Sequence, residues 1–255
     1  MNLHDTILIN PILNILVAFY QLLMTFHVPF ALGFAIILMT AFIRLLLFPI
    51  TASQIRMSKK MQEIAPHLKK IREKHKGNMQ KQQQETMAIY QQHGVNPAAG
   101  CLPGIVQIVI LVFGLYPALL KLLQHNTEQT MEIVNAAVYF PFLRLTQPWD
   151  TNFFGMVLEK TPGQLLPTLG IVVFLIPVIT GLTQLIQSKM MMPVADPNVK
   201  KEKTTQAEDF MVTFQKQSLY LIPAMVGVFS YTFSVGLSLY WNTFTIFGII
   251  QQYQI

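Results

Sequence analysis

The sequence predicts an all-α, polytopic membrane protein with five transmembrane helices, an N-terminal interfacial amphipathic helix and a cytoplasmic helical hairpin. Of its 255 residues, 52% are hydrophobic and only 12% are charged, whereas soluble proteins carry about 25% charged residues. No charged residue occurs between Asp5 and Arg44, and none follows Lys216. Soluble folds do not leave such long stretches uncharged, so these observations indicate a membrane protein.

The first element, over residues 1–27, is predicted to lie on the outer membrane face. Asn10 and Pro11 suit the start of a helix. The apolar run up to Phe26 would be only about 24 Å long, too short to cross a bilayer comfortably. Its polar residues fall on one narrow stripe, which favours an interfacial helix. An extra span, which would invert the topology, remains the alternative. No Lys or Arg precedes the run, so it is not a secretory signal peptide.

Five later segments are apolar enough to span about 30 Å of hydrocarbon. The last 39 residues are uncharged, nearly twice the length that one crossing needs. We therefore expect a turn at Ser234, Val235 and Gly236. The predicted spans are 28–48, 103–123, 165–187, 218–234 and 237–255.

The loops between the spans differ in charge, and this difference predicts their sides. The net charge of +6 is 18 basic minus 12 acidic residues. Nine basic and three acidic residues lie within 51–100, so the excess sits in one loop and does not indicate nucleic-acid binding. By the positive-inside rule, loops 49–102 and 188–217 are cytoplasmic, and the acidic loop 124–164 is outside. The N-terminus is then outside and the C-terminus cytoplasmic.

The first cytoplasmic loop has the pattern of an antiparallel helical hairpin. Lys76, Gly77 and Asn78 suit a turn, and a merely solvated connector with a packed seam remains the alternative reading. The apolar residues before the turn recur in steps of four and three, and a second stripe is expected to return after it. The two stripes are Met57, Met61, Ile64, Leu68 and Ile71, and then Met79, Gln83, Met87 and Tyr90.

Reactive groups expected of an enzyme are missing from the sequence. The six histidines have no metal-ligand spacing, and no nucleophile, phosphate-loop or zinc motif is present. The single Cys101 begins a span and is expected to be a packed residue. No carboxylate lies inside a predicted span, which removes the usual coupling group of a pump. We therefore expect no catalytic residue, no metal and no cofactor.

Arg44 is the one charge inside a predicted span, about five residues from its cytoplasmic end. An Arg at the centre of a bilayer costs at least about 2.5–3.5 kcal/mol. Either its side chain extends to the interface, or it lies in a watered cavity. Polar residues of other spans favour the cavity, although singly they are typical of interhelical hydrogen bonds or an aromatic belt. They are Gln107, Thr180, Thr183, Gln184, Gln187, Ser238, Tyr240, Trp241, Asn242 and Thr245.

Together these residues predict a polar groove, open to the cytoplasm and positively charged only at Arg44. Moving a desolvated polar group through hydrocarbon costs several kcal/mol. Polar side chains held half-way would shorten that path for a short polar or acidic tail, and no bond-making would be needed.

Four segments in this order resemble the YidC-type membrane protein insertases of the Oxa superfamily, in the five-span form typical of Gram-positive bacteria. The arginine-bearing end of the first span and the entry to the second are similar to the family's. So are the end of the third span and the last span. The segments are FIRLLLFPI (42–50), QQHGVNPAAGCLPGIVQ (91–107), PVITGLTQLIQSKMMMP (177–193) and GLSLYWNTFTIFGIIQQYQI (236–255).

The resemblance implies an insertase and chaperone of the bacterial cell membrane that helps newly made membrane proteins enter the lipid bilayer, alone or beside the Sec translocon. Arg44, Gln107 and Trp241 match its groove positions, to which helical spacing adds Gln184 and Asn242. Tyr240, near the outer end of the last span, is also expected to line the groove. The hairpin would receive substrates, with the ribosome and the signal recognition particle receptor as further candidate partners. The expected hairpin contacts are Met57, Met61, Lys74, Lys76 and Met79.

Two further readings stay open beside the insertase. One is a small transporter or channel that binds an anionic solute at Arg44. The other is an assembly factor that only packs against new helices. The basic C-terminal tail that some relatives use at the ribosome does not follow Ile255, so ribosome binding through a tail is not expected.

Overall fold

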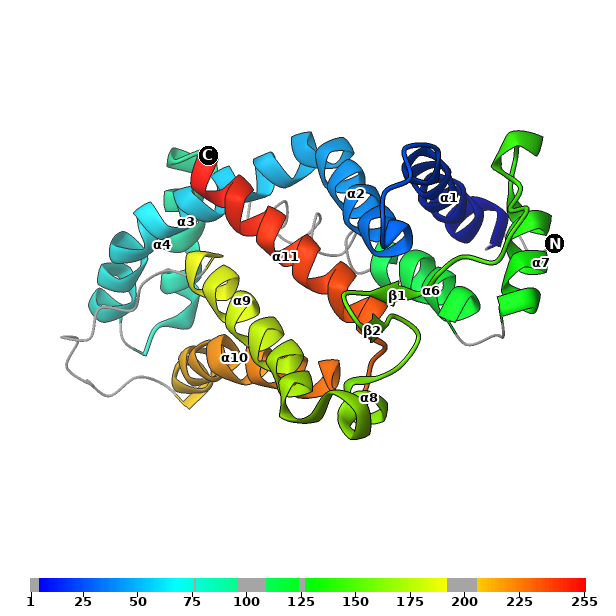
Figure 1. The fold of residues 1–255 in the computed structure, drawn as a ribbon. Coiled ribbons are helices and arrows are strands. Elements are labelled where there is room, and N and C mark those ends of the chain that lie inside the picture. The colour runs from blue at the N-terminus through cyan, green and yellow to red at the C-terminus, as the bar shows by residue number, and fades with distance from the viewer. Residues whose placement is uncertain (1–4, 76, 96–108, 124–126, 192–205) are drawn as a thin grey trace.

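The computed structural model describes residues 5–75, 77–95, 109–123, 127–191 and 206–255. Within them the chain is mostly helical (Figure 1). The strands described form one short antiparallel pair, β1 (Asn152–Phe153) and β2 (Met156–Val157). The all-α membrane class predicted from composition agrees with this architecture.

The N-terminal segment forms a π-helical turn, η1 (Asp5–Ile9), that continues into α1 (Asn10–Thr25). Pro11 lies in the first turn of α1, directly after η1, so it removes one N–H from the combined helix. The combined helix Asp5–Thr25 has 21 residues and a mean hydropathy of 1.9, so by length and composition it could cross a membrane. Including η1 lengthens the apolar run beyond the segment that predicted an interfacial helix.

The first predicted core span, 28–48, contains α2 (Ala31–Leu46). After Leu47 the chain bends by 66° into α3 (Phe48–Lys74). Pro49 lies in the first turn of α3, and its ring disfavours continuation of the preceding helix. The bend therefore ends the apolar helix close to the boundary that hydropathy predicts.

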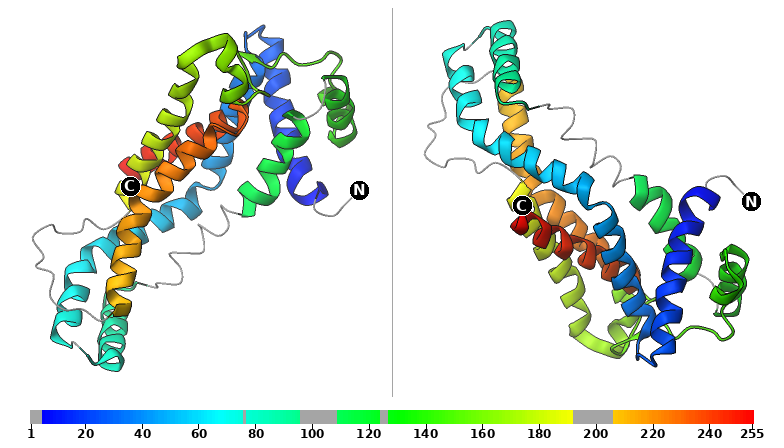
Figure 2. Two further views of the ribbon diagram at one scale, coloured as in Figure 1. Left: turned by 90° about the horizontal axis from the view of Figure 1, so that it is seen from below. Right: turned by 90° about the horizontal axis from the view of Figure 1, so that it is seen from above.

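Helix α3 packs against α4 (Met79–Gln92), and both project from one end of the molecule (Figures 1 and 2). Ile64 and Leu68 of α3 form a small buried cluster with Val95, against which Ile89 and Tyr90 of α4 pack. The cluster explains why the two helices stay together outside the main bundle.

The predicted returning stripe of α4 is wrong at three of its four residues, because Met79, Gln83 and Met87 are all exposed. Met79 is 61% exposed and Met87 is 52% exposed, while Gln82 is buried. The Gln82 side chain donates to the carbonyl of His75 at 3.0 Å, and the Asn78 side chain caps the start of α4. These polar contacts set the rotation of α4 and turn both methionines outward, so helical spacing alone chose the wrong face.

The second predicted span, 103–123, is described from residue 109 onward. It changes helix type from the π-helical η2 (Ile110–Leu115) to α6 (Tyr116–Leu123). Pro117 stands at the second position of α6, directly after η2, so its missing N–H falls where the helix type changes. Lys121 of α6 pairs with Asp5 at 2.8 Å, which connects the segment to η1.

The loop after α6 forms α7 (Thr127–Ala137), the 3₁₀ turn η3 (Pro141–Leu143) and the two strands. Phe153 of β1 is buried against Gly33 of α2, at a distance that leaves no room for a side chain at Gly33. The rings of Phe30 and Phe34 lie edge-on to Phe153. An aromatic cluster thus fastens this loop to the start of α2.

The third predicted span, 165–187, is a 30-residue apolar segment, Pro162–Met191. It comprises α8 (Pro162–Leu169), the 3₁₀ turn η4 (Gly170–Phe174) and α9 (Leu175–Met191). Gly170 has φ +60°, a conformation that favours glycine, where α8 gives way to η4.

The last two helices are α10 (Gln206–Ser230) and α11 (Val235–Gln254). The turn between them comes slightly earlier than predicted, because the Ser234 side chain caps the backbone N–H of Leu237 and α11 already begins at Val235. The Val235 and Gly236 N–H groups donate to the carbonyls of Lys160 and Leu158, both at 2.9 Å. The start of α11 is thereby joined to the preceding loop.

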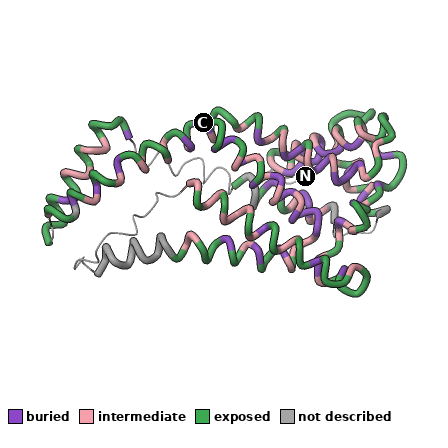
Figure 3. The backbone as a smooth tube through the Cα atoms, turned by 60° about the vertical axis from the view of Figure 1, so that its left-hand side comes forward, coloured by how far each residue is buried: buried purple, intermediate pink, exposed green. Residues whose placement is uncertain are grey.

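Over the described residues, two helices are long and apolar enough to cross a membrane, or three if the bent α2–α3 pair counts as one span; Gln217–Ser230 of α10 is a shorter apolar stretch. Helix α11 packs against both α2 and α9, α9 also packs on α10, and α1 lies along α2 (Figures 1 and 2). Buried residues gather at the end of the bundle that holds the N-terminus (Figure 3). Many apolar side chains of α9 and α10 are exposed, as on lipid-facing helices.

Candidate polar site between helices α2, α9 and α11

Arg44 lies in the last turn of α2 and is only 4% exposed. Its Nε and Nη2 groups donate to the backbone carbonyl of Phe244 on α11, at 3.1 and 2.8 Å. Nη1 donates to Oε1 of Gln251 at 3.3 Å, and Gln251 Nε2 returns a bond to the Arg44 carbonyl at 3.4 Å. The guanidinium carbon lies 3.5 Å from the centre of the Phe244 ring, a cation–π contact.

The structure holds Arg44 in a closed contact between α2 and α11, not in the predicted open cavity. The side chain turns inward against α11 and is buried there. The Phe244 carbonyl oxygen has two lone pairs, so it can accept from Arg44 and still accept a backbone hydrogen bond within α11. The predicted groove is closed at this point in the structure.

The partners that the described residues give Arg44 are all neutral. A guanidinium has five N–H groups, and three of them are used by the bonds to Phe244 and Gln251. The remaining two have no acceptor among the described residues. The cation thus keeps both its net charge and part of its hydrogen-bonding capacity.

Gly248 makes this approach possible. A Cβ atom at Gly248 would lie 2.6 Å from Nη2 of Arg44 and would also collide with Nε2 of Gln187. A glycine one turn after Phe244 therefore lets a cation from α2 and an amide from α9 reach the same spot on α11. The three helices meet there through polar groups.

A second polar contact joins α9 to α11 about two turns earlier. Asn242 donates to the Thr180 hydroxyl at 2.9 Å and accepts from the Thr183 hydroxyl at 3.2 Å. Its amide also donates to the Ser238 carbonyl at 2.9 Å. Such interhelical bonds stabilise packing where water is absent.

Gln184 and Trp241 meet beside this contact. The indole N–H of Trp241 donates to Oε1 of Gln184 at 3.2 Å. Tyr240 is buried on the same helix, and its ring lies 5.7 Å from that of Phe244. The structure thus brings the predicted residues of α9 and α11 together, and Phe244 connects them to Arg44.

The remaining predicted groove and hairpin residues lie elsewhere or outside the described part of the chain. Gln107 and Lys76 lie outside the described residues. The hydroxyl of Thr245 bonds within α11, to the carbonyl of Trp241. On the hairpin, Met57 and Met61 pack on the buried cluster, while Lys74 and Met79 are exposed. Within the described part of the chain, no group of three His, Cys, Asp or Glu side chains could hold a metal ion.

Sequence reasoning missed the direct partners of Arg44. Gln251 lies near the end of α11, where a polar residue reads as an ordinary helix end, and a backbone carbonyl leaves no mark in a sequence. The available signal was spacing: Phe244, Gly248 and Gln251 fall on one helix face, at steps of four and three.

Comparison with known proteins assigns the family. Residues 22–255 match the family model described as 60Kd inner membrane protein. The chain belongs to this family. The insertase YidC of Oceanobacillus iheyensis is 34% identical over 224 residues, which cover 86% of this chain and 72% of the relative. The insertase MisCA of Bacillus subtilis is 33% identical, covering 88% and 69%.

The resemblance to YidC-type insertases seen in the four sequence segments is therefore confirmed. A longer relative, the YidC insertase of Caulobacter vibrioides, is 32% identical over 253 residues; these cover 96% of this chain and 35% of the relative. Family membership and the apolar helices indicate a bacterial membrane protein with an insertase function.

Proposed function

We propose that this protein inserts membrane proteins by giving a short polar or acidic tail a temporary partner at Arg44. The observation that carries the proposal is a buried cation whose described partners are all neutral. A carboxylate that displaced these partners would gain a charge-assisted, bidentate bond to the guanidinium. The apolar part of the same substrate would leave sideways into lipid.

Access to Arg44 requires an exchange of partners in this mechanism. The tail would compete with Gln251 and the Phe244 carbonyl for the guanidinium, and α11 would separate slightly from α2. The bonds to be broken are made to uncharged groups, so a carboxylate is the stronger partner. The tail would then travel a shorter distance without polar contact.

The proposed orientation follows the charge distribution of the loops. The hairpin of α3 and α4 and the C-terminus would be cytoplasmic, and the N-terminus and the loop 124–164 would be outside. Nascent membrane proteins would meet the hairpin first, alone or beside the Sec translocon, the ribosome or the signal recognition particle receptor. The helix of residues 1–27 would lie at the outer interface.

A reconstituted insertion assay tests the role of Arg44. Liposomes containing only this purified protein would receive a single-span substrate with an acidic outer tail. Wild type should insert it well above empty liposomes, Arg44→Ala should lose most of that activity, and Arg44→Lys should keep most of it because the charge remains. A substrate whose acidic residues are replaced by Ser and Gly should lose its dependence on Arg44.

Different results of this assay would reject the arginine mechanism and the insertase function separately. Insertion that is equal in wild type and Arg44→Ala would keep the insertase and reject the arginine mechanism. Equal loss in the Ala and Lys variants at normal folding would reject an account based on charge alone. The transporter alternative instead predicts stabilisation by a small anion that depends on Arg44, without insertion.

A further inference from the structure

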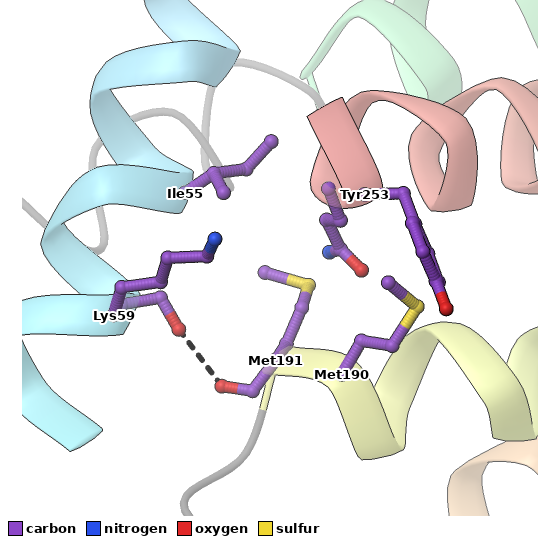
Figure 4. A pocket seen from close by; sticks show the side chains of 7 residues that line it. Ile55, Lys59, Met190, Met191 and Tyr253 are labelled. Carbon is purple, nitrogen blue, oxygen red and sulfur yellow. Dashed lines mark hydrogen bonds between the residues drawn. The ribbon is translucent and has the colours of Figure 1, made fainter. Parts of the chain in front are cut away.

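A separate pocket of about 300 Å³ lies where α3, α9 and α11 approach one another. Figure 4 shows its walls, with the Lys59 side chain of α3 directed into the space and Met190 and Met191 of α9 below it. Ile55, Ser58, Gln252 and Tyr253 complete the lining of the pocket. Arg44 does not line this pocket.

Hydrogen bonds between α3 and α9 hold the pocket in shape. The Ser58 hydroxyl donates to the carbonyl of Met191 at 2.9 Å (Figure 4), and Gln62 Nε2 donates to the carbonyl of Met190 at 3.3 Å. The last carbonyls of a helix lack partners within the helix, and here α3 supplies them. These two carbonyls are therefore occupied, and the side chains of Lys59 and Gln252 remain for a ligand.

Among the described residues, Gln252 has a buried acceptor atom without a hydrogen-bond partner. The residue is only 7% exposed, and its Oε1 atom is buried with no hydrogen-bond partner among the described residues. A buried acceptor without a donor is costly, and each case calls for an explanation. A rotation of the Gln252 amide that brought Oε1 to the pocket wall would let an O–H or N–H group of a ligand satisfy it.

Apolar residues near the pocket in sequence are exposed, as on helices that face lipid. Ile186, one turn before Met190 on α9, is 50% exposed, and Ile250, two residues before Gln252 on α11, is 45% exposed; both belong to apolar helices. On the other side α3 carries the first cations after the bend, among them Lys59. The site thus combines one cation, one unsatisfied acceptor and an adjoining apolar surface.

We propose that this pocket binds one anionic glycerophospholipid whose headgroup carries hydroxyl groups. Its phosphate would pair with Lys59, a headgroup hydroxyl would donate to Gln252 Oε1, and its acyl chains would follow Ile186 and Ile250. The flexible side chains of Met190 and Met191 adapt to the glycerol region. The adjoining apolar surface favours a lipid over a water-soluble acidic peptide, because the acyl chains need such a surface.

Lipid titration of the purified protein tests the proposal. Native mass spectrometry would compare three probes in mixed micelles: phosphatidylglycerol, the equally anionic phosphatidylmethanol without headgroup hydroxyls, and zwitterionic phosphatidylcholine. For wild type we expect a Kd for phosphatidylglycerol about tenfold below that for phosphatidylcholine, with phosphatidylmethanol between them.

Three variants test whether the lipid preference arises at this pocket. Lys59→Gln should remove the preference for anionic lipids, while Lys60→Gln, with the same change of net charge on the same helix, should retain it. Gln252→Leu should remove the difference between phosphatidylglycerol and phosphatidylmethanol and keep the preference for charge. Equal thermal unfolding midpoints would show that the variants are folded.

Three results would overturn the proposal. One is a wild type that binds the three lipids equally. Another is equal loss in Lys59→Gln and Lys60→Gln, since that would indicate general attraction between the basic hairpin and anionic lipids. The third is binding of an acidic apolar peptide, but not of phosphatidylglycerol, that depends on Lys59 and Gln252, which would assign the pocket to a substrate.

Discussion

Arg44 and Gln251 bind each other twice across the contact between α2 and α11. The guanidinium donates to the side-chain oxygen of Gln251, and the Gln251 amide donates to the backbone carbonyl of Arg44. The pair therefore positions the cation and also occupies a carbonyl at the end of α2, where carbonyls lack partners within the helix. It stabilises α2 and α11 as a unit at the level of the proposed tail-binding site.

We expect Gln251→Ala to lower the free energy of unfolding by about 1–3 kcal/mol, because a hydrogen bond to a charged group is lost in a buried place. Thermal unfolding in detergent would measure the change. Gln254→Ala, on the exposed end of the same helix, is the matched control and should have little effect. Equal shifts in both variants would show that the Arg44 pair does not stabilise the bundle.

Gly248→Ala should displace Arg44. The new methyl group would collide with the guanidinium and with Gln187, so we expect a loss of about 1–3 kcal/mol together with reduced insertion. Gly181→Ala in α9 is the control, because its Cβ would make only ordinary contacts of 3.5 Å or more. The better helix propensity of Ala should leave that variant neutral or slightly more stable. If Gly248→Ala behaves the same way, Arg44 does not need this close approach.

Gly33→Ala should loosen the loop that carries β1 from α2. The added methyl group would overlap the ring of Phe153, which is held between Phe30 and Phe34. Overpacking of this kind costs about 1–3 kcal/mol. The double variant Gly33→Ala/Phe153→Ala tests the cause, since it should be less destabilised than the sum of its two single changes. Strict additivity in thermal unfolding would contradict the contact.

Glu159 should make stability depend on pH. Partial burial raises the pKa of its carboxyl above the usual 4.5, and the neighbouring Lys160 opposes this shift. Below pH 4.5 the group is protonated in both states. As the pH rises from 4.5 through the higher folded pKa, the unfolded state ionises first, so the folded state loses stability relative to it.

A comparison of wild type with Glu159→Gln between pH 4 and pH 7 would reveal this dependence. The variant should gain stability over wild type as the pH rises. A constant difference between Glu159→Gln and wild type across the range would contradict the burial of that carboxyl.

Helical spacing and composition were enough to predict which faces of α9 and α11 are polar. In the structure Trp241 bonds to Gln184 and Asn242 bonds to Thr180, because a period of 3.6 residues determines the face of a single helix. Spacing does not determine the rotation of one helix against another. It therefore missed Gln251 as the partner of Arg44, and it placed Met79 and Met87 in a seam from which the bonds of Gln82 and Asn78 turn them away.

The acceptors around Arg44 are a backbone carbonyl and a side-chain amide, and neither group titrates in the range in which cells live. No change of pH from 5 to 8 can therefore weaken the contact by protonating these partners. Under the proposed mechanism, the tail's own carboxyl groups would decide at which pH it can compete for the cation. The same protein would then favour tails that are ionised in the compartment where they are made and would release them more easily where they become protonated.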